Sequence, residues 1–347
     1  MKGNIYLLDI MNVAQANLPW NKLKNKCILI TGATGLIGSF IVDLLMYRNA
    51  EYKDNIKIIA LCRNYEAAQM RFTSHLKNSN FFILQQDVCE PLNIDANIDY
   101  IIHGASNADP ISFSKDPVGT MMANLSGTYN ILNYAAQNSV TRTVFLSTGE
   151  VYGEGNGDVL TFTEDYYGYV NFNSPRACYP ESKRAAETLC SSFLRQFNID
   201  IVIARLCYVY GSTMSKKDSR VIAQFVRNAV NNEDIVMKSD GLQLRSYCYI
   251  SDAVSAIICL LLMGKKGEIY NIANSNSNVT IKEIAETLAK LFRLKIRYEV
   301  PSVTERDGYS IVKQAVLNAE KIEKLGWKAS INLDEGLKRT VSILREL

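Results

Sequence analysis

The 347-residue sequence contains only two histidines, His75 and His103, and this scarcity restricts its chemistry. A catalytic zinc site and a Ser-His-Asp triad both draw on histidine, so neither is well supplied. The eight cysteines are scattered, and no Cys-x-x-Cys pair occurs. Most of them stand inside apolar runs, which is typical of reduced cysteines that act as small hydrophobic side chains. We therefore expect a reduced, cytoplasmic protein with no metal site.

A large excess of charge and a long apolar run are also lacking. The 38 basic and 35 acidic residues give a net charge of +3, and neither sign forms a tail. The longest apolar run, residues 256–263, is far shorter than the roughly 20 residues that cross a bilayer. The first residues, MKGNIYLLDI, do not have the pattern of a cleavable signal. We expect no nucleic-acid partner and no membrane association.

Apolar runs and helical patterns alternate along the first part of the chain. After a leader of residues 1–25, expected to include a short helix packed on the outside, the pattern predicts strands and helices in turn. This alternation predicts an α/β fold with a doubly wound parallel sheet, the Rossmann type. The expected strands are 27–31, 56–61, 81–84, 100–103, 143–147 and 199–205, and the expected helices are 36–48, 120–138 and 180–197.

The second part of the chain has a looser rhythm and predicts a smaller C-terminal α/β lobe. Length and a 48% apolar content fit one large domain or two intimate ones. We expect the Rossmann domain to comprise residues 26–205 plus about 250–272, and the lobe to comprise 206–249 and 273–347. The pattern predicts a loop at 211–218, a strand at 268–272 and helices at 221–230, 251–263 with Ser251 as N-cap, 280–292 and 333–344.

A glycine-rich turn, TGATGLIG at residues 31–38, follows the first strand and opens the first helix. Gly32 permits a tight turn, Gly35 lets the backbone approach a pyrophosphate, and Gly38 lets the helix pack closely on the strand. The amides at the helix start then face the phosphates. The turn predicts a dinucleotide site; the alternative is a glycine turn without a ligand. Further cofactor contacts are expected at Thr34, Leu36 and Ile37.

The end of the second strand bears on the choice between NAD and NADP. NAD-binding proteins usually place an acidic residue there, whereas this chain has Cys62 followed by Arg63. Arg63 is placed to meet a 2′-phosphate, so the sequence favours NADP; the alternative is a solvated loop arginine. Asp87 either contacts adenine or caps a turn. The other expected cofactor contacts are Asn64, Val88 and Ala105.

Tyr179 and Lys183 form a Y-x-x-x-K pattern at the start of a predicted helix. A spacing of four residues places both side chains on one helix face. We expect the ammonium of Lys183 to lower the phenol pKa of Tyr179 from its reference of ~10, and to hydrogen-bond a nicotinamide ribose. Such a tyrosine exchanges a proton with a carbinol or ketone during hydride transfer. Ser147 and Thr148, at the end of the fifth strand, can supply a hydroxyl to the same oxygen.

Five motifs together resemble the extended short-chain dehydrogenase/reductases, the nucleotide-sugar epimerase/dehydratase family. They are TGATGLIG (31–38), DYIIHGAS (99–106), STGEVYG (147–153), YPESK (179–183) and RLCYVYG (205–211). Residues 164–189, 218–225 and 244–252 are most similar to the UDP-glucuronate decarboxylase branch. The resemblance implies an NAD(P)-binding Rossmann domain, a substrate-binding lobe and hydride transfer at carbon 4 of a nucleotide-diphosphate sugar. It also implies a homodimer formed through helices at about 124–138 and 180–197.

The resemblance also implies roles for single residues. Thr148 matches the residue that holds the sugar 4-hydroxyl, Tyr179 the active-site base, and Lys183 its partner. Glu150 matches a glutamate that is a base in sugar 4,6-dehydratases and lies at the active site of decarboxylases. Arginines in this family clamp the diphosphate, and a surface ion pair is the alternative for each of them here. The matching or neighbouring arginines are Arg176, Arg220 and Arg245.

Four positions depart from the family pattern and leave the net reaction open. Gly149 replaces an aspartate of many 4,6-dehydratases, and Tyr208 stands where relatives often have a substrate-binding Asn. The pair at 237–238 lacks the usual aromatic residue near the base, and 313–318 lacks a clear R-P-D segment. Epimerisation, decarboxylation, dehydration and NADPH-dependent 4-keto reduction all remain open. A non-catalytic NAD(P)-binding sensor is the alternative from another class.

Two further features carry a structural alternative. His103, at a strand end beside the expected cofactor site, is interpreted as a strand histidine with its hydrogen bonds satisfied. The tyrosines 166, 167 and 169 either line a sugar pocket or pack within a loop.

Overall fold

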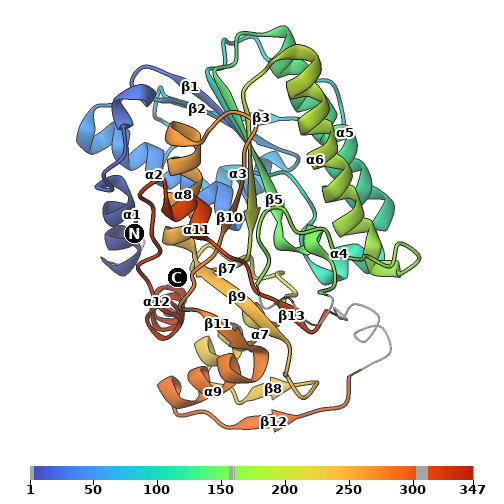
Figure 1. The fold of residues 1–347 in the computed structure, drawn as a ribbon. Coiled ribbons are helices and arrows are strands. Elements are labelled where there is room, and N and C mark those ends of the chain that lie inside the picture. Colours follow the sequence, from blue (N-terminus) through green and yellow to red (C-terminus); the bar gives the residue numbers. More distant parts are fainter. Residues whose placement is uncertain (1–3, 156–158, 160, 302–311, 347) are drawn as a thin grey trace.

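The computed structural model describes residues 4–155, 159, 161–301 and 312–346. Its largest element is a seven-stranded parallel sheet with the order β3-β2-β1-β4-β5-β6-β10 (Figure 1). The central strand β1 pairs with β2 on one side and β4 on the other, so the strand order reverses there. In sheets of this kind, ligands bind just outside the carboxyl ends of the strands, at the point where the strand order reverses. The strands are β1 (Cys27–Thr31), β2 (Lys57–Cys62), β3 (Phe81–Gln85), β4 (Tyr100–His103), β5 (Arg142–Thr148), β6 (Ile201–Leu206) and β10 (Ile269–Ile272).

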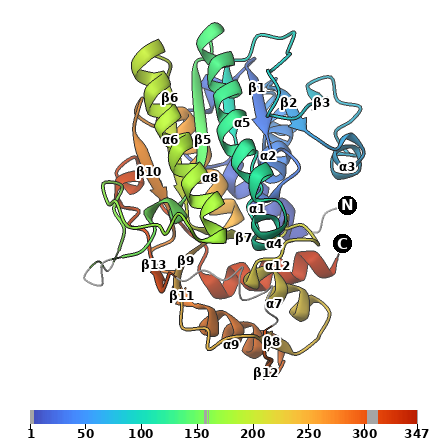
Figure 2. The ribbon, with the colours of Figure 1, turned by 90° about the vertical axis from the view of Figure 1, so that its right-hand side faces the viewer.

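Helices cover both faces of this sheet because its central strands are apolar on both sides. Every residue of β1 and of β6 is buried, as expected for a parallel strand between two helical layers. Helices α5 (Pro117–Gln137) and α6 (Cys178–Phe197) lie side by side on one face, and α2 (Leu36–Tyr52) and α8 (Ile250–Met263) lie on the other (Figures 1 and 2). Shorter helices α3 (Tyr65–Arg71) and α4 (Pro110–Lys115) follow the ends of β2 and β4.

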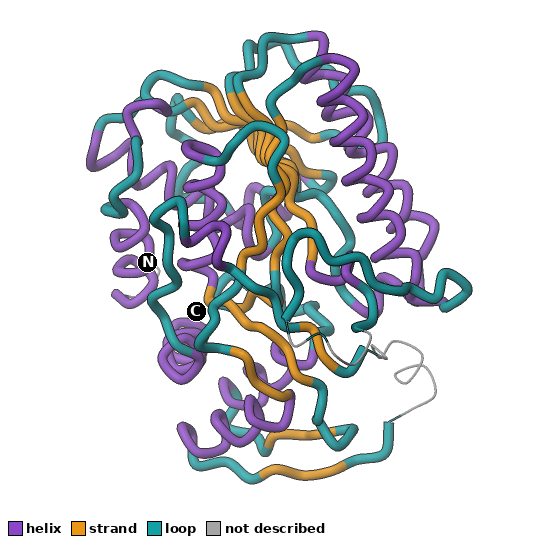
Figure 3. Tube along the Cα trace, viewed as in Figure 1, coloured by secondary structure: helices purple, strands orange, loops and turns teal. Residues whose placement is uncertain are grey.

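A smaller lobe lies below the carboxyl ends of the large sheet (Figure 3). Its centre is strand β9, which pairs in parallel with β7 and β13 and antiparallel with β11. A separate pair joins β8 to β12. The strands are β7 (Tyr208–Tyr210), β8 (Ile235–Met237), β9 (Leu244–Tyr249), β11 (Asn278–Thr280), β12 (Ile296–Tyr298) and β13 (Gln314–Ala315), and the helices are α7 (Val221–Val230), α9 (Ile281–Phe292), α11 (Glu320–Glu323) and α12 (Leu333–Arg345).

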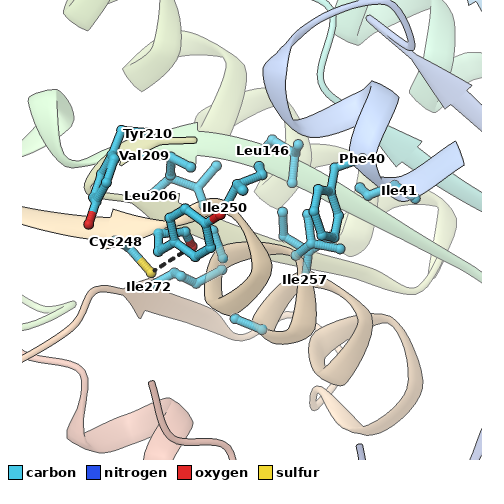
Figure 4. Packing of buried hydrophobic residues seen from close by; sticks show 14 of the residues in the cluster. Phe40, Ile41, Leu146, Leu206, Val209, Tyr210, Cys248, Ile250, Ile257 and Ile272 are labelled. Carbon is cyan, nitrogen blue, oxygen red and sulfur yellow. Dashed lines mark hydrogen bonds between the residues drawn. The ribbon is translucent and has the colours of Figure 1, made fainter. Parts of the chain in front are cut away.

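One hydrophobic cluster continues from the large sheet into the smaller lobe. Helix α8 lies at its centre and is buried along nearly its whole length. Figure 4 shows Phe40 of α2, Leu146 of β5 and Cys248 of β9 around Ile250 and Ile257 of this helix. Because side chains of α8 pack against both the large sheet and the smaller lobe, the lobe has a fixed position relative to the large sheet.

The leader forms helix α1 (Asn4–Ala14) and a short 3-10 turn at Trp20–Leu23. Helix α1 contacts α2, α8 and α12, so it touches elements from both ends of the chain. Its buried residues include Tyr6, Asp9 and Ile10. The expected outer helix is therefore present, and one of its sides belongs to the core.

The predicted α/β doubly wound fold is confirmed. The ends of most predicted elements differ from the observed ends by one to four residues. One detail is wrong: Ser251 does not cap its helix, which begins at Ile250 with Tyr249 as N-cap, so Ser251 lies in the first turn. All eight cysteines are free, and only Cys89 is not buried. The predicted assignment of residue ranges to two domains stays a prediction.

Candidate active site

The glycine-rich turn connects β1 to α2 and lies against Gly104, the residue that follows β4. Gly32 has a φ of +67°, and a Cβ at this position would lie 2.7 Å from the Gly104 carbonyl oxygen. A Cβ at Gly38 would lie 2.4 Å from the Gly32 carbonyl oxygen, so a side chain there would push α2 off the turn. Gly35 is the N-cap of α2 and provides no side-chain cap, so a ligand can accept from the amides at the helix start.

A cleft of about 1030 Å³ begins at this turn and reaches the smaller lobe. All three described sheets contribute to its wall: the large one through the carboxyl ends of β1, β4, β5 and β6, the four-stranded one through β9 and β13, and the two-stranded one through β8. Its size suits an extended ligand such as a dinucleotide together with a second molecule. The predicted residues along it are Gly32, Gly35, Leu36, Ile37, Gly38, Thr148, Glu150, Arg176, Tyr179, Lys183, Tyr208, Arg220 and Arg245.

The remaining predicted cofactor contacts do not line this cleft. Arg63 is exposed beyond the end of β2, and its Nη2 donates to Asn107 Oδ1 at 3.2 Å. The Asn64 side chain caps α3 by accepting from the Ala67 amide at 2.8 Å. Arg63 therefore lies outside the cleft, but its partner Asn107 stands between two residues that line it, Ser106 and Ala108.

Asp87 and Val88 both have a structural partner after β3. The Asp87 carboxylate accepts from the Cys89 amide at 2.9 Å, which is the turn-capping role considered for it. Val88 is buried and lies against Gly127 of α5. The amide of Ala105 donates to Thr31 Oγ1 at 3.1 Å, which fixes the loop after β4 against the glycine turn. Thr34 lies in that turn.

Tyr179 lies in the first turn of α6 and faces the cleft. Its ring stacks on Phe113 of α4, with 4.7 Å between ring centroids and an interplanar angle of 21°. Burial and then the nearby Glu150 carboxylate raise the pKa of the Tyr179 phenol, and a hydrogen bond with Thr148 opposes this rise. The phenol is therefore protonated at neutral pH in this arrangement and can donate to an oxygen in the cleft.

Lys183 lies one turn further along α6 and is almost fully buried. Its Nζ donates to the Leu146 carbonyl oxygen at 2.8 Å and lies 4.7 Å from the centroid of the Phe145 ring. Burial lowers the pKa of Lys183 to about 8. The predicted lowering of the Tyr179 pKa is not what the structure shows, because the ammonium is turned toward β5 and the phenol is dominated by burial.

An ion-pair network beneath the site fixes α6 to the sheet. Ser147 Oγ donates to Glu187 Oε1 at 2.5 Å, and Arg205 Nη2 donates to Glu187 Oε2 at 2.7 Å. These contacts join β5, β6 and α6 in a buried region. Ser147 and Thr148 both line the cleft, but the Ser147 hydroxyl donates to Glu187, which leaves Thr148 as the available hydroxyl. Sequence motifs did not reveal this network, because its three members are far apart in the chain.

Glu150, Arg176 and Tyr208 form a second group beside Tyr179. Arg176 Nη2 donates to Glu150 Oε1 at 2.6 Å, with side-chain exposures of 15% for Arg176 and 19% for Glu150. The Tyr208 hydroxyl donates to the same Glu150 oxygen at 3.5 Å. Burial raises the pKa of Tyr208, and the Glu150 carboxylate adds to this rise. The structure thus brings a carboxylate, a guanidinium and two phenols together at one end of the cleft.

The two arginines predicted to hold a diphosphate lie on the smaller-lobe side of the cleft. Arg220 Nη2 donates to Asp218 Oδ2 at 2.6 Å, and its Nη1 donates to the Val209 carbonyl at 2.8 Å. Arg245 Nη1 donates to the Leu244 carbonyl at 2.9 Å and to the Lys313 carbonyl at 3.2 Å. Both guanidiniums are held in place by the chain, and their diphosphate role stays a prediction.

The departures from the family pattern have structural counterparts in the cleft wall. A Cβ at Gly149 would lie 2.9 Å from a methyl carbon of Leu317, so Leu317 occupies the space that a side chain at 149 would need. Leu317 belongs to the 313–318 segment that lacks the R-P-D pattern, and Met237 and Lys238 line the other end of the cleft.

The tyrosines of the 166–169 loop lie outside this cleft. Tyr166 stacks on Phe162 with 4.9 Å between centroids, and its hydroxyl donates to the Glu154 carbonyl. Tyr167 and Tyr169 are largely exposed. Of the two interpretations given for these tyrosines, packing within the loop describes Tyr166.

Helix α4, which the sequence pattern did not reveal, forms part of the site through Phe113. Its N-cap Asp109 accepts from the Ser112 amide and also from Ser219 Oγ at 2.8 Å, so it joins the two sides of the cleft. The Asp109-Pro110 pair is a recognised helix-start signal and could have indicated this helix.

Neither a metal centre nor a membrane span is evident in the part of the chain that the structure describes. No three His, Cys, Asp or Glu side chains there lie close enough to hold a metal ion. None of the described helices has the length and apolarity to cross a membrane.

A doubly wound α/β sheet with a glycine turn, and with a tyrosine, lysine and threonine in one cleft, defines the class of nicotinamide-dependent Rossmann enzymes. The chain belongs to the NAD dependent epimerase/dehydratase family, whose model matches residues 28–273. This confirms the predicted family and the prediction of an enzyme.

Curated relatives agree with this assignment over most of the chain. UDP-glucuronic acid decarboxylase 1 of Danio rerio is 34% identical over 328 residues, which are 93% of this chain and 73% of the relative. UDP-glucuronic acid decarboxylase 6 of Arabidopsis thaliana is 34% identical over 313 residues, which are 90% of this chain and 87% of the relative. The predicted similarity to this branch is confirmed, and with it nicotinamide-dependent modification of a nucleotide sugar at the level of the family.

Solved structures share the fold at lower sequence identity. The dTDP-glucose 4,6-dehydratase DesIV of Streptomyces venezuelae, with NAD and TYD bound, has a TM-score of 0.80 and 24% identity, and the match covers 92% of this chain and 97% of that one. The UDP-glucuronic acid 4-epimerase of Bacillus cereus, in complex with UDP-glucuronic acid and NAD, has a TM-score of 0.77 and 24% identity, with coverage of 92% and 99%.

Proposed function

We propose that the protein oxidises carbon 4 of UDP-glucuronate, releases its carboxylate as carbon dioxide and then reduces carbon 4 again. The observation that carries this proposal is the convergence of Thr148, Glu150 and Tyr179 in one cleft that begins at the glycine turn. The identity to UDP-glucuronic acid decarboxylases over most of the chain supports the choice of sugar. The general reaction is modification of a nucleotide-diphosphate sugar through hydride transfer at carbon 4.

The residues of the cleft fit a bound nicotinamide dinucleotide. Gly32, Gly35 and the amides that begin α2 would hold its pyrophosphate, and Lys183 would face its ribose. A cofactor bound there would supply reversible hydride transfer at carbon 4, with no net consumption of the cofactor. The uncapped start of α2 and the lack of any side chain at Gly35 are the observations that support this fit.

The side chains at the sugar end would handle the protons of the reaction. Thr148 would accept or donate a hydrogen bond at the 4-oxygen while Tyr179 exchanges a proton with it. The resulting 4-keto sugar is a β-keto acid, whose C5–C6 bond breaks to give carbon dioxide and a C4–C5 enol. Protonation of carbon 5 restores the ketone, and Glu150 is placed at this end of the cleft to act on that step.

The test is incubation with UDP-glucuronate and either NAD or NADP, followed by mass spectrometry. We expect a product lighter by one carbon dioxide, and we expect Tyr179→Phe to lose turnover while it still binds the cofactor. A panel of UDP-, dTDP-, GDP- and CDP-sugars serves as the control for base and sugar. Full activity of the Tyr179→Phe variant, or an unchanged mass of UDP-glucuronate, would contradict the proposal.

We infer a preference for NADP over NAD from the end of β2. The strand ends in Leu61 and Cys62 without a carboxylate, and the next residue, Arg63, is exposed and donates to Asn107 of the loop after β4. An arginine at this position suits a 2′-phosphate better than a free ribose hydroxyl. Turnover measured with each cofactor in the incubation above tests this preference.

A second candidate is an NADPH-dependent reductase of a nucleotide-4-keto sugar. Arg63 favours it, because a reductase that draws NADPH from solution needs the 2′-phosphate contact. In that case a gain of two hydrogens would replace the loss of carbon dioxide in the same mass measurement.

We also propose a cytoplasmic homodimer that pairs through α5 and α6. These helices lie side by side on one face of the molecule (Figure 2). Their outer residues include Met121, Met122, Tyr129 and Phe197, each with at least 37% of its surface exposed. Exposed apolar side chains on two adjacent helices are typical of a subunit interface. The free cysteines suit a reducing compartment.

A further inference from the structure

We propose that Arg176 selects sugars that carry a carboxylate, by exchanging its bond with Glu150 for a bond with the substrate's carboxylate. This inference rests on the proposed function and names the group that recognises the charge. Arg176 lies in the short turn before α6, three residues ahead of Tyr179. Its Nη2 donates to Glu150 Oε1 at 2.6 Å within the cleft.

The guanidinium is fixed on the same stack as the reacting phenol. Its central carbon lies 5.2 Å from the centroid of the Phe113 ring, whose other contact is the Tyr179 ring at 4.7 Å. Arg176 and Tyr179 therefore contact the same ring. Carbon 6 of a hexuronate is two bonds from carbon 4, so a sugar whose carbon 4 meets Tyr179 would bring its carboxylate to this side of the cleft.

Three other cations that line the cleft have different hydrogen-bond partners in the described structure. Lys183 donates to the Leu146 carbonyl, and Arg245 donates to backbone carbonyls of residues 244, 312 and 313. Arg220 pairs with Asp218, two residues before it in the chain. Of these groups, Arg176 is the one whose partner is a carboxylate beside Tyr179, so a substrate carboxylate can replace that partner with like chemistry.

The exchange explains how recognition and chemistry are joined. A guanidinium can bind a carboxylate through two parallel N–H bonds, so a substrate carboxylate can take the place of Glu150. When the substrate carboxylate binds Arg176, Glu150 is released from its ion pair and becomes available beside the sugar. A neutral hydroxymethyl group at carbon 6 cannot compete with Glu150, and the ion pair then stays closed.

The test compares the binding of UDP, UDP-glucose and UDP-glucuronate to the protein and to Arg176→Gln by titration calorimetry. We expect Arg176→Gln to weaken the binding of UDP-glucuronate about 10- to 100-fold, which is the range of a charge-assisted hydrogen bond. The affinities for UDP and UDP-glucose should change less than about 3-fold. Arg176→Lys should recover part of the affinity for UDP-glucuronate. Unchanged UDP binding also shows that the variant is folded.

Arg220→Gln is the matched control, since an arginine on the diphosphate side should weaken all three ligands alike. The same pattern in Arg176→Gln would mean that Arg176 binds the diphosphate, and it would overturn the inference. Equal affinity of Arg176→Gln and the parent protein for UDP-glucuronate would overturn it as well. These outcomes differ from failure of the proposed function, which is seen as absence of carbon dioxide release by the parent protein.

Discussion

At the scale of the residue, His103 shows how a polar side chain is held inside the parallel sheet. Its Nδ1 lies 2.7 Å from Thr31 Oγ1 and its Nε2 lies 3.2 Å from Thr128 Oγ1, so both ring nitrogens have partners. Thr31 Oγ1 also accepts from the amides of Gly104 and Ala105. The neutral imidazole therefore supports the loops at the cofactor end of the cleft.

Burial, with a smaller effect from Lys183, lowers the pKa of His103 to about 3. In the unfolded chain the ordinary value is about 6.5, so the unfolded state binds more protons between these two values. The stability that His103 contributes is complete above pH 6.5 and is lost as pH falls toward 3. Replacing it by an uncharged side chain removes this dependence.

We expect His103→Gln to flatten the dependence of unfolding free energy on pH. Between pH 7 and pH 5 the parent protein should lose about 2 kcal/mol more than the variant. Urea denaturation at the two pH values, followed by circular dichroism, measures this difference. Parallel losses in the two proteins would show that His103 does not remain neutral in the fold.

Other residues of the site differ in how far sequence could indicate them. The glycine turn and the Tyr179–Lys183 pair are local patterns, because a turn and one helix face are set by neighbours in the chain. The stack of Phe113 on Tyr179 and the pair of Arg176 with Glu150 join separate elements. Such contacts depend on packing of the whole fold, so residue type and spacing did not reveal them.

At the scale of the element, helix α1 connects the two ends of the chain. Asp9 is fully buried and accepts from the Tyr249 hydroxyl at 2.5 Å and from Arg339 Nη1 at 2.6 Å. Tyr249 ends β9 and Arg339 lies on α12. One carboxylate therefore links three elements of which two belong to the smaller lobe.

We expect Asp9→Ala to lower the free energy of unfolding by about 2–4 kcal/mol, because it leaves a buried hydroxyl and a guanidinium without their shared acceptor. Glu335→Gln is the control. It removes the second carboxylate that pairs with Arg339, but the Glu335 side chain is 44% exposed. We therefore expect it to lower the free energy of unfolding by less than about 1 kcal/mol. Chemical denaturation measures both, and equal effects would contradict the role of Asp9.

Helices and strands could be predicted from the sequence where a regular pattern of apolar residues extends over their whole length. Strands such as β1 and β4 and helices such as α7 have the expected bounds, because continuous apolar runs and helical spacing extend over their whole length. Strands β7, β11 and β13 have only two or three residues each and form by pairing with β9. So short a segment has no periodicity of its own, and the smaller sheet was accordingly missed.

At the scale of the whole molecule, the proposed dimer gives a direct test of the α5–α6 face. We expect light scattering at micromolar concentration to give twice the chain mass of 38.9 kDa. Met122→Glu should give the single chain mass, because it buries a charge in the interface. Met70→Glu, at a 74% exposed position on α3, should leave the mass unchanged. A parent protein with the mass of one chain would contradict the dimer.

The parallel sheet also constrains the order in which a ribosome can complete this protein. Strand β10, which pairs with β6, and helix α8, which covers β5 and β6, are translated only after β7, β8 and β9. A nascent chain that ends at β6 therefore already contains the glycine turn, α2 and the Tyr179 helix, but it still lacks α8, the helix that covers β5 and β6. Vectorial synthesis therefore leaves the apolar β5–β6 part of this face of the sheet exposed until residues 250–263 have been translated.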